Sequence, residues 1–323
     1  MEKIVIIGAN SFQNPLILKA KEMGYETHVF AWESGDIGEK TADYFYPISI
    51  TEKEKILEEC KKIHPKAVVS IASDLAVLTV NYIAEKLGLT SNNPENSKIC
   101  TNKYEMRKAF EKAGVRVPKF KNVGIGEKID LEEFRMPVIV KPTDRSGSRG
   151  ITKVDKKEEI KEAVKNAIDN SFEKRAIIEE FIGGHEYSCE CISFHGKHQF
   201  LAITRKFTTG APHFIETGHI QPSGLTEEQE RIVKYEIFKA LDALKIENGP
   251  SHSEFKIDTD GNIGIIEIGA RMGGDCIGSD LVKISTGYDF LKLTIDVATR
   301  KRAFIRKNRR TKNCSYKIYI CQK

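Results

Sequence analysis

The sequence has little that would suit a membrane or the secretory pathway. No apolar segment approaches the length of a membrane span, and the apolar run in the opening MEKIVIIGAN is too short for a signal peptide. The seven cysteines are scattered, odd in number and without CxxC spacing. These absences exclude a disulfide-stapled secreted domain, and they predict a cytoplasmic protein with free thiols and no membrane partner.

A large excess of one charge is also absent. Lys and Arg outnumber Asp and Glu by 51 to 46, which gives a net charge of +5 and suits an enzyme that handles anions better than a dedicated nucleic-acid binder. The basic run at residues 300–312 contains no acid and a single aromatic residue, Phe304. We interpret this run as a solvated linker with no nucleic-acid partner, because nucleic-acid sites interleave cations with aromatic side chains.

The first third of the chain alternates strand and helix patterns. A β-branched run at Lys3–Ile7 ends at Gly8 and leads into a helix and a second strand. The alternation continues to a helix at 75–87, which Ser73 or Asp74 would cap. We therefore expect a doubly wound α/β unit with a parallel sheet. The first turn lacks the rest of GxGxxG, which favours a structural Rossmann-like unit over a dinucleotide site.

The remaining chain changes from mixed helix and strand to mostly strand. Helix patterns lie at 103–113, 155–168 and 227–244, and strand patterns at 138–140, 151–154, 176–182, 186–194, 199–205 and 253–268. A chain of 323 residues exceeds one average domain, and 40% hydrophobic residues can fill more than one core. The order predicts a small α+β module followed by a larger α+β body.

The segment KPTDRSGSRGI, residues 141–151, is rich in glycine, serine and cations. Walker and dinucleotide loops lead from a strand into a helix, whereas this segment connects two strand patterns and lacks GxxxxGK[ST]. We interpret residues 146–150 as a flexible hairpin tip whose backbone N–H groups fold over phosphates, with Lys141 as a point charge on the preceding strand. An ordinary exposed loop is the alternative.

Two glutamates are expected to face each other in the hairpin SEFKIDTDGNIGIIEIG, residues 253–269. The turn signal Asp260-Gly261 predicts a two-residue loop, which pairs Glu254 with Glu267 across the ladder. Opposed carboxylates are destabilising unless a cation lies between them, and hard oxygen ligands indicate Mg²⁺ or Mn²⁺. The alternatives are a solvated face and a one-residue bulge that breaks the register.

With these two features in place, the chain resembles an ATP-grasp ligase over about residues 1–300. The resemblance is carried, in order, by TNKYEMRKAFEKAGVRVP, PVIVKPTDRSGSRGI, AIIEEFIGGHEYS, KFTTGAPHFIETGHIQP, HSEFKID and IIEIGARMGGD. Within that superfamily the chain is most similar to the carboxylate–amine ligases, which include L-amino-acid (dipeptide) ligases, and to carbamoyl-phosphate-synthase-like proteins.

The resemblance implies an α/β ATP-grasp fold in four parts. They are a Rossmann-like pre-ATP-grasp domain at 1–97, a linker helix with a small α+β lid at 98–184, a larger α+β catalytic subdomain at 185–302, and a basic tail at 303–323. The tail holds one strand-like segment, Ser315–Cys321. It would be the end of a compact variant, the truncated start of a further C-terminal domain, or part of a fragment that takes a partner to complete its site.

The resemblance also implies an ATP site. Contacts to ATP are implied for Lys103, Lys141, Ser146, Gly147, Ser148, Gly150, Glu179, Glu180, Phe181, Ile182 and Glu186. The two lysines would bind the phosphates, and the loop 146–150 would cover them as a lid. Glu179 and the backbone of residues 180–182 would read the adenine edge, while Glu186 would bind the ribose. For the three glutamates, an ordinary solvated strand face is the alternative.

Metal and substrate contacts are implied on the other side of the site. Glu254 and Glu267 match the family's metal ligands, but Gly269 stands where many relatives have Asn, which leaves the number of metals open. Arg271, with Lys141, would be catalytic, near the transferring phosphoryl group and the substrate carboxylate; a structural pair with Asp275 is the alternative. Further substrate contacts are implied for Lys206, Glu216 and His219, with surface charge or a satisfied loop histidine as alternatives.

The implied reaction is ATP-dependent activation of a carboxylate, such as an amino acid, as an acyl phosphate. An amine would then attack to give an amide, with release of ADP and phosphate. The alternatives are an ATP-grasp enzyme that activates bicarbonate, and a nucleotide-binding module without catalysis. The partners would be ATP, Mg²⁺ or Mn²⁺ and small-molecule substrates, with a homodimer as a further expectation.

Overall fold

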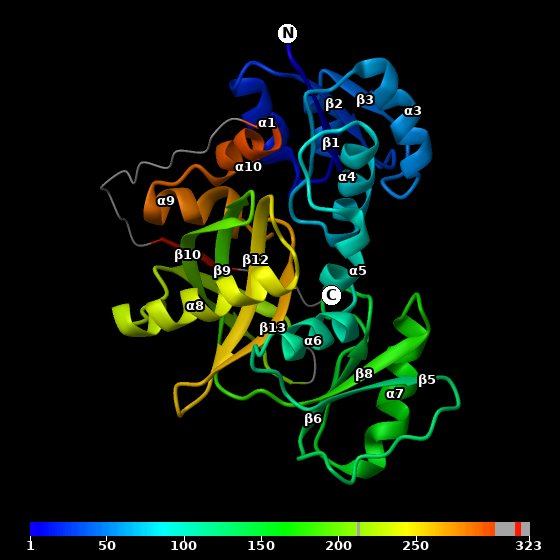
Figure 1. The fold of residues 1–323 in the computed structure, drawn as a ribbon, viewed down its shortest axis with the longest axis vertical. Coiled ribbons are helices and arrows are strands. Elements are labelled where there is room, and N and C mark those ends of the chain that lie inside the picture. Colours follow the sequence, from blue (N-terminus) through cyan, green and yellow to red (C-terminus); the bar gives the residue numbers. More distant parts are fainter. Residues whose placement is uncertain (212–213, 301–313, 318–323) are drawn as a thin grey trace.

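The computed structural model describes residues 1–211, 214–300 and 314–317, and they form an α/β fold built on three sheets (Figure 1). The basic run at 301–313 lies outside the described residues. Of the strand predicted at 315–321, residues 318–321 also lie outside them, and Cys314–Lys317 forms strand β14. Within the described part, no helix is long and apolar enough to cross a membrane.

The first sheet confirms the doubly wound opening. Its four parallel strands lie in the order β3-β2-β1-β4. The strands are β1 (Lys3–Ile7), β2 (Glu26–Phe30), β3 (Tyr44–Tyr46) and β4 (Ala67–Val69), and the helices are α1 (Asn14–Glu22), α2 (Ile37–Thr41), α3 (Lys53–Ile63) and α4 (Asp74–Lys86). The β-branched run of β1 is buried on both faces, because α1 packs on one side and α3 and α4 on the other.

The second sheet is antiparallel and lies at the far end of the molecule from the first (Figure 1). Its strands are β5 (Phe120–Gly124), β8 (Arg175–Glu180), β6 (Val138–Pro142) and β7 (Thr152–Val154), in that order across the sheet. The helix α7 (Ile160–Asn170) covers one face and closes its own apolar core. The short turn η2 (Lys157–Glu159) precedes α7. The turn η1 (Pro94–Asn96) and the helices α5 (Ser97–Thr101) and α6 (Lys103–Lys112) connect the first unit to this sheet.

The third sheet has six strands in the order β13-β12-β9-β10-β11-β14. They are β9 (His185–Phe194), β10 (Lys197–Thr208), β11 (Glu216–Gln221), β12 (Gly249–Ile257), β13 (Ile263–Gly269) and β14, with the helices α8 (Glu227–Ala243), η3 (Ile277–Leu281), α9 (Val282–Thr286) and α10 (Phe290–Ala298). Neighbouring residues of β9 point to opposite faces: Cys191 packs in the core under α8, whereas Ile192 packs with α10 and the first sheet. The domain boundaries given above stay predictions.

The β12–β13 hairpin pairs Glu254 with Glu267, as predicted, although the turn is not the one expected. Ile257 pairs with Ile263, so residues 258–262 form the connection in place of a two-residue loop. A bulge next to Glu254 then inserts one extra residue into β13 and shifts the register by one. The longer turn and the bulge compensate each other, which brings the two carboxylates opposite each other.

Candidate active site

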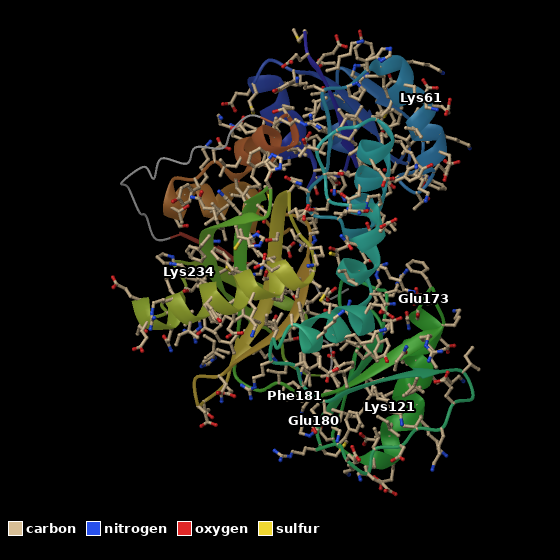
Figure 2. All side chains as sticks on the ribbon, viewed as in Figure 1. Lys61, Lys121, Glu173, Glu180, Phe181 and Lys234 are labelled. Carbon is tan, nitrogen blue, oxygen red and sulfur yellow. The ribbon has the colours of Figure 1, made fainter. Side chains whose placement is uncertain are left out.

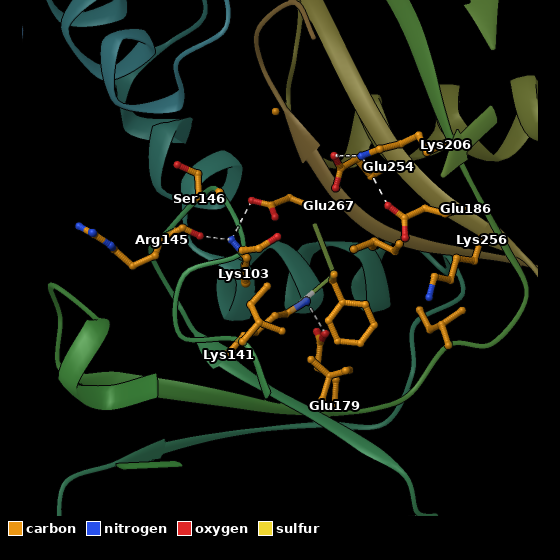
Figure 3. Close-up of a pocket in the computed structure, with 18 of the residues that line it drawn as sticks. Lys103, Lys141, Arg145, Ser146, Glu179, Glu186, Lys206, Glu254, Lys256 and Glu267 are labelled. Atoms are coloured by element: carbon orange, nitrogen blue, oxygen red, sulfur yellow. Dashed lines mark hydrogen bonds and ion pairs between the residues drawn. The ribbon is translucent and has the colours of Figure 1, made fainter. Parts of the chain in front are cut away.

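A cleft lies where the second sheet, helix α6 and the β12–β13 hairpin meet (Figure 3). Nearly all the residues that the sequence predicts for the site line this cleft. They are Lys103, Lys141, Ser146, Gly147, Ser148, Glu179, Glu180, Phe181, Ile182, Glu186, Lys206, Glu216, Glu254, Glu267 and Arg271. Gly150 and His219 do not line it. Segments more than a hundred residues apart in the chain therefore converge on one cleft.

Lys141 lies on β6 and is buried against Glu179 of the neighbouring strand β8. Its Nζ is 2.6 Å from Glu179 Oε2, while Arg107 of α6 places Nε 2.5 Å from Oε1. Burial would raise the pKa of Glu179, but Arg107 and Lys141 outweigh burial and lower it to about 2. For Lys141, burial lowers the pKa and Glu179 offsets only part of that effect. Glu179 is therefore a buried anion between two cations.

This pairing gives Glu179 two ionic partners that the sequence did not predict. Its carboxylate oxygens accept from Arg107 and Lys141, and its contact with an adenine edge stays a prediction. The sequence offered a signal for Arg107, because it lies one helical turn after Lys103 and so shares its face of α6. At the cleft, Glu179 is the anion that pairs with both Lys141 and Arg107.

The end of β8 offers fewer backbone donors than expected. Figure 2 labels Glu180 and Phe181, which lie where the second sheet approaches the rest of the molecule. Their N–H groups donate to the carbonyls of Lys119 and Pro137 at 2.9 and 3.0 Å. Among the residues that the structure describes, nothing accepts from Ile182 N–H. Ile182 is thus the donor that this segment can offer to a base.

Lys103 connects the loop 146–150 with the glutamate hairpin. Asn102 caps α6, and its side chain accepts from Tyr104 N–H and Glu105 N–H, which fixes the first turn. From that turn Lys103 Nζ donates to Arg145 O at 2.7 Å and to Glu267 Oε1 at 2.8 Å (Figure 3). The loop and the hairpin therefore share one ammonium group.

The loop 146–150 has the backbone of a tight turn. Ser148 has φ 55°, and Gly147 and Gly150 have φ 71° and 69°, in the left-handed region that glycine tolerates best. A Cβ at Gly150 would lie 2.9 Å from Asn170 Cβ, so this glycine packs against α7 outside the cleft. The guanidinium of Arg145 stacks on Phe172, 4.3 Å from the ring centre. The part of the loop that faces the cleft is therefore residues 146–148.

A second cation, Lys206 on β10, lies among three carboxylates. Its Nζ is 2.7 Å from Glu254, 2.8 Å from Glu216 and 3.5 Å from Glu186. Burial would lower the pKa of Lys206, but the three carboxylates outweigh burial and raise it above its usual value. Glu186 contacts Lys206 and lines the cleft. Its contact with the ribose stays a prediction.

A buried histidine next to Glu254 was missed in the sequence. His252 Nδ1 is hydrogen-bonded to Glu190, and its Nε2 is 3.3 Å from Glu254 Oε1. Burial would lower the pKa of His252, but Glu190 raises it to about 9, with a smaller contribution from Glu254. The sequence did hold a signal for His252, namely its spacing from Glu254, because residues two apart on a strand point to the same face.

Glu254 and Glu267 have the chemistry that a divalent cation needs. They are opposed carboxylates on paired strands, each about one quarter exposed and open to the cleft. Each accepts a hydrogen bond from one lysine, Glu254 from Lys206 and Glu267 from Lys103. Hard oxygen donors in this arrangement fit Mg²⁺ or Mn²⁺, and they would hold the ion between the two strands.

The predicted substrate residues form a polar cluster beside Lys206. His219 is fully buried on β11, and its Nε2 is 3.0 Å from Glu216 Oε2. Burial would raise the pKa of Glu216, but His219 and Lys206 lower it to about 2. Asp275 lies within 4.8 Å of both, and burial raises its pKa. His219 therefore acts behind Glu216 and does not line the cleft itself.

Arg271 pairs with Asp74, not with the Asp275 considered from the sequence. Arg271 Nε and Nη2 donate to the two carboxylate oxygens of Asp74 at 2.8 and 3.2 Å. Asp74 begins helix α4 in the first unit, where Ser73 provides the cap. The cleft therefore includes a side chain from the first unit, which sequence reasoning treated as structural only.

Comparison with known proteins gives a consistent picture. The ATP-grasp domain profile matches residues 134–280. Alanine–anticapsin ligase from Bacillus subtilis is 30% identical over 298 residues, which are 81% of this chain and 62% of that protein. The chain thus spans less than two thirds of that relative.

Solved structures extend the match to nearly the whole chain. The L-amino acid ligase from Bacillus licheniformis superposes with a TM-score of 0.81 at 26% identity, covering 93% of this chain and 74% of that one. Phosphoribosylglycinamide synthetase from Anaerococcus prevotii has a TM-score of 0.82 at 24% identity, covering 99% and 81%, and shows the shared fold. The domain match identifies an ATP-grasp domain at residues 134–280, and the superpositions show that the chain has the ATP-grasp fold.

Proposed function

We propose that this chain is an ATP-dependent ligase that activates a carboxylate, such as that of an amino acid, and joins it to an amine. The observation that carries the proposal is the cleft itself. It brings the cations Lys103 and Lys141 opposite the carboxylates Glu254 and Glu267, with Arg271 at the same cleft. Phosphate charge would be neutralised on one side, and a divalent cation held on the other.

In the first step, a carboxylate oxygen of the substrate attacks the γ-phosphorus of ATP. The bond from that phosphorus to the bridging oxygen breaks, and ADP leaves with the electron pair. Lys103 and Lys141 would stabilise the charge on the phosphates, and Arg271 would hold the substrate carboxylate with a planar, forked donor set. Mg²⁺, when bound by Glu254 and Glu267, would supply further neutralisation of phosphate charge.

In the second step, a neutral amine attacks the acyl carbon and phosphate leaves. The nitrogen then loses a proton to give the amide. Glu216 and Lys206, with His219 buried behind Glu216, would form the substrate side of the cleft, because they present both signs of charge to a small zwitterion. The loop 146–148 would cover the phosphates and keep water from the acyl phosphate.

Amino-acid substrates are favoured over bicarbonate by the relatives. The two relatives with at least 25% identity described above are ligases whose names specify alanine–anticapsin and L-amino acids. A bicarbonate-bound carboxylase domain from Hydrogenobacter thermophilus shares the fold at 20% identity, which carries no substrate argument. Bicarbonate is therefore kept as the second candidate.

A screen of substrate pairs tests the proposal. We expect ADP and phosphate release, in the presence of Mg²⁺ and ATP, only when a free amino acid or small carboxylate is present together with an amine. Coupled ADP detection over an array of amino-acid pairs, with mass spectrometry of the product, measures this directly. ADP release with bicarbonate alone would replace the proposal with the second candidate. ATP binding without turnover for any pair would favour a nucleotide-binding module.

A further inference from the structure

The contact between Asp74 and Arg271 joins two parts of the chain that are far apart in sequence. The carboxylate and the guanidinium meet in a bidentate pair, and their side chains are 20% and 18% exposed. Asp74 is the first residue of α4, and Ser73 Oγ caps the helix by accepting from Ala76 N–H at 3.2 Å. Asp74 is therefore free of the capping role, and its side chain points into the cleft.

Gly269 makes room for this pair. A Cβ at position 269 would lie 2.8 Å from Asp74 Oδ1 and 3.1 Å from Arg271 Nε. The first distance is shorter than side-chain contacts allow, so any larger residue would displace the carboxylate. The backbone of Gly269 is not in the left-handed region, and an alanine there would meet no backbone strain. Gly269 thus leaves open the space that the Asp74 carboxylate occupies.

Arg271 has competing partners in the cleft. The carboxylates of Glu254 and Glu267 lie close enough to contribute to its raised pKa, although burial opposes them and Asp74 contributes more. Two of the donors of Arg271 are taken by Asp74, and Nη1 donates to Met272 O at 3.3 Å. A guanidinium has five N–H donors, so others remain for a ligand. Without Asp74, the guanidinium could turn to the proposed metal ligands.

We propose that Asp74 is a positioning residue, which holds Arg271 away from Glu254 and Glu267 in the space that Gly269 leaves open. This inference rests on the role of Arg271 in the proposed function. It gives the first α/β unit a part in the site, because the N-terminal end of α4 fixes the orientation of Arg271, which follows strand β13. Asp74 and Gly269 form a matched pair, because a side chain at position 269 would meet the Asp74 carboxylate.

Thermal unfolding of the apo protein tests the matched pair without any substrate. We expect Gly269→Ala to lower the unfolding midpoint in the wild-type background and to lower it much less in Asp74→Ala, where the carboxylate is gone. Gly274→Ala is the control, because a Cβ there would meet only Ala72 Cβ at an ordinary 3.8 Å. If Gly269→Ala lowers the midpoint equally in both backgrounds, the matched pair is refuted.

Turnover tests the positioning role, with the amino-acid pair that gives the most ADP in the screen. We expect Asp74→Asn to lower kcat by about tenfold to a hundredfold, since a small misplacement of a catalytic group costs that much. The Kd for ATP, measured by calorimetry, should stay within about twofold, because Asp74 acts through Arg271. Asp74→Asn keeps the shape of the side chain and so guards against misfolding.

Ser73→Ala separates positioning from loss of helix stability. It removes the cap of the same helix and leaves the Asp74 carboxylate in place. We expect a lower unfolding midpoint with an unchanged kcat. A kcat of Asp74→Asn within twofold of wild type, or an equal loss in Ser73→Ala, overturns the proposal. If the wild type releases no ADP with any pair, the proposed function fails, while the unfolding experiment still decides the Asp74–Gly269 pair.

Discussion

Replacing Glu267 by glutamine should abolish substrate-dependent ADP release. The change keeps the shape of the side chain and an oxygen that can accept from Lys103, but it removes the negative charge opposite Glu254. A neutral amide is a much poorer ligand for Mg²⁺ than a carboxylate. We expect kcat to fall by about a hundredfold or more, because charge neutralisation of the phosphates is a main source of rate enhancement in phosphoryl transfer. Coupled ADP detection measures the loss.

A direct measurement of metal binding keeps this prediction separate from turnover. Titration of Mn²⁺ in the presence of ADP, followed by electron paramagnetic resonance, should show weaker binding in Glu267→Gln than in wild type. Asp260→Asn is the matched control, because it removes a carboxylate from the exposed turn of the same hairpin. Undiminished turnover or unchanged Mn²⁺ affinity in Glu267→Gln would rule out this glutamate as a metal ligand.

The fold and much of the site could be predicted because their signals are local. The run Lys3–Ile7 and the strand–loop–strand around residues 141–151 carry their own periodicity, and the structure has strands there. The opposition of Glu254 and Glu267 was predicted from a turn that is not present. It holds because a longer connection and a bulge shift the register by one residue in opposite senses.

The partners of the charged residues could not be predicted in the same way. Arg271 and its partner Asp74 are 197 positions apart, and Arg107 and Glu179 are 72 apart. A carboxylate near the end of a strand has the same local pattern whether it faces a base, a cation or water. Only the packing of α4 and α6 against the sheets decides between these, which is why the ion pairs of Glu179 with Arg107 and Lys141 were not predicted.

Replacing Glu179 by glutamine should be the most destabilising change at the cleft. The variant leaves Arg107 and Lys141, which are 1% and 4% exposed, without their shared anion. Removing one partner from a buried ionic group typically costs about 3–5 kcal/mol of unfolding free energy. Urea denaturation at pH 7 measures this loss. Glu133→Gln is the matched control, because Glu133 pairs with Lys119 at 2.6 Å while 81% exposed, and surface pairs contribute about 1 kcal/mol or less.

The pH dependence gives this prediction a second test. The pKa of Glu179 is lowered to about 2 in the folded state, from 4.5 for the unperturbed group, so its contribution is present above about pH 4.5 and lost as the pH falls toward 2. The difference in unfolding free energy between wild type and Glu179→Gln should therefore shrink across that window. The variant should also gain stability as the pH rises, because Lys141, whose pKa is already lowered by burial, loses its offsetting anion and releases its proton more readily. A loss no larger than that of Glu133→Gln, or a difference that does not change between pH 4.5 and 2, would contradict the buried ionic group.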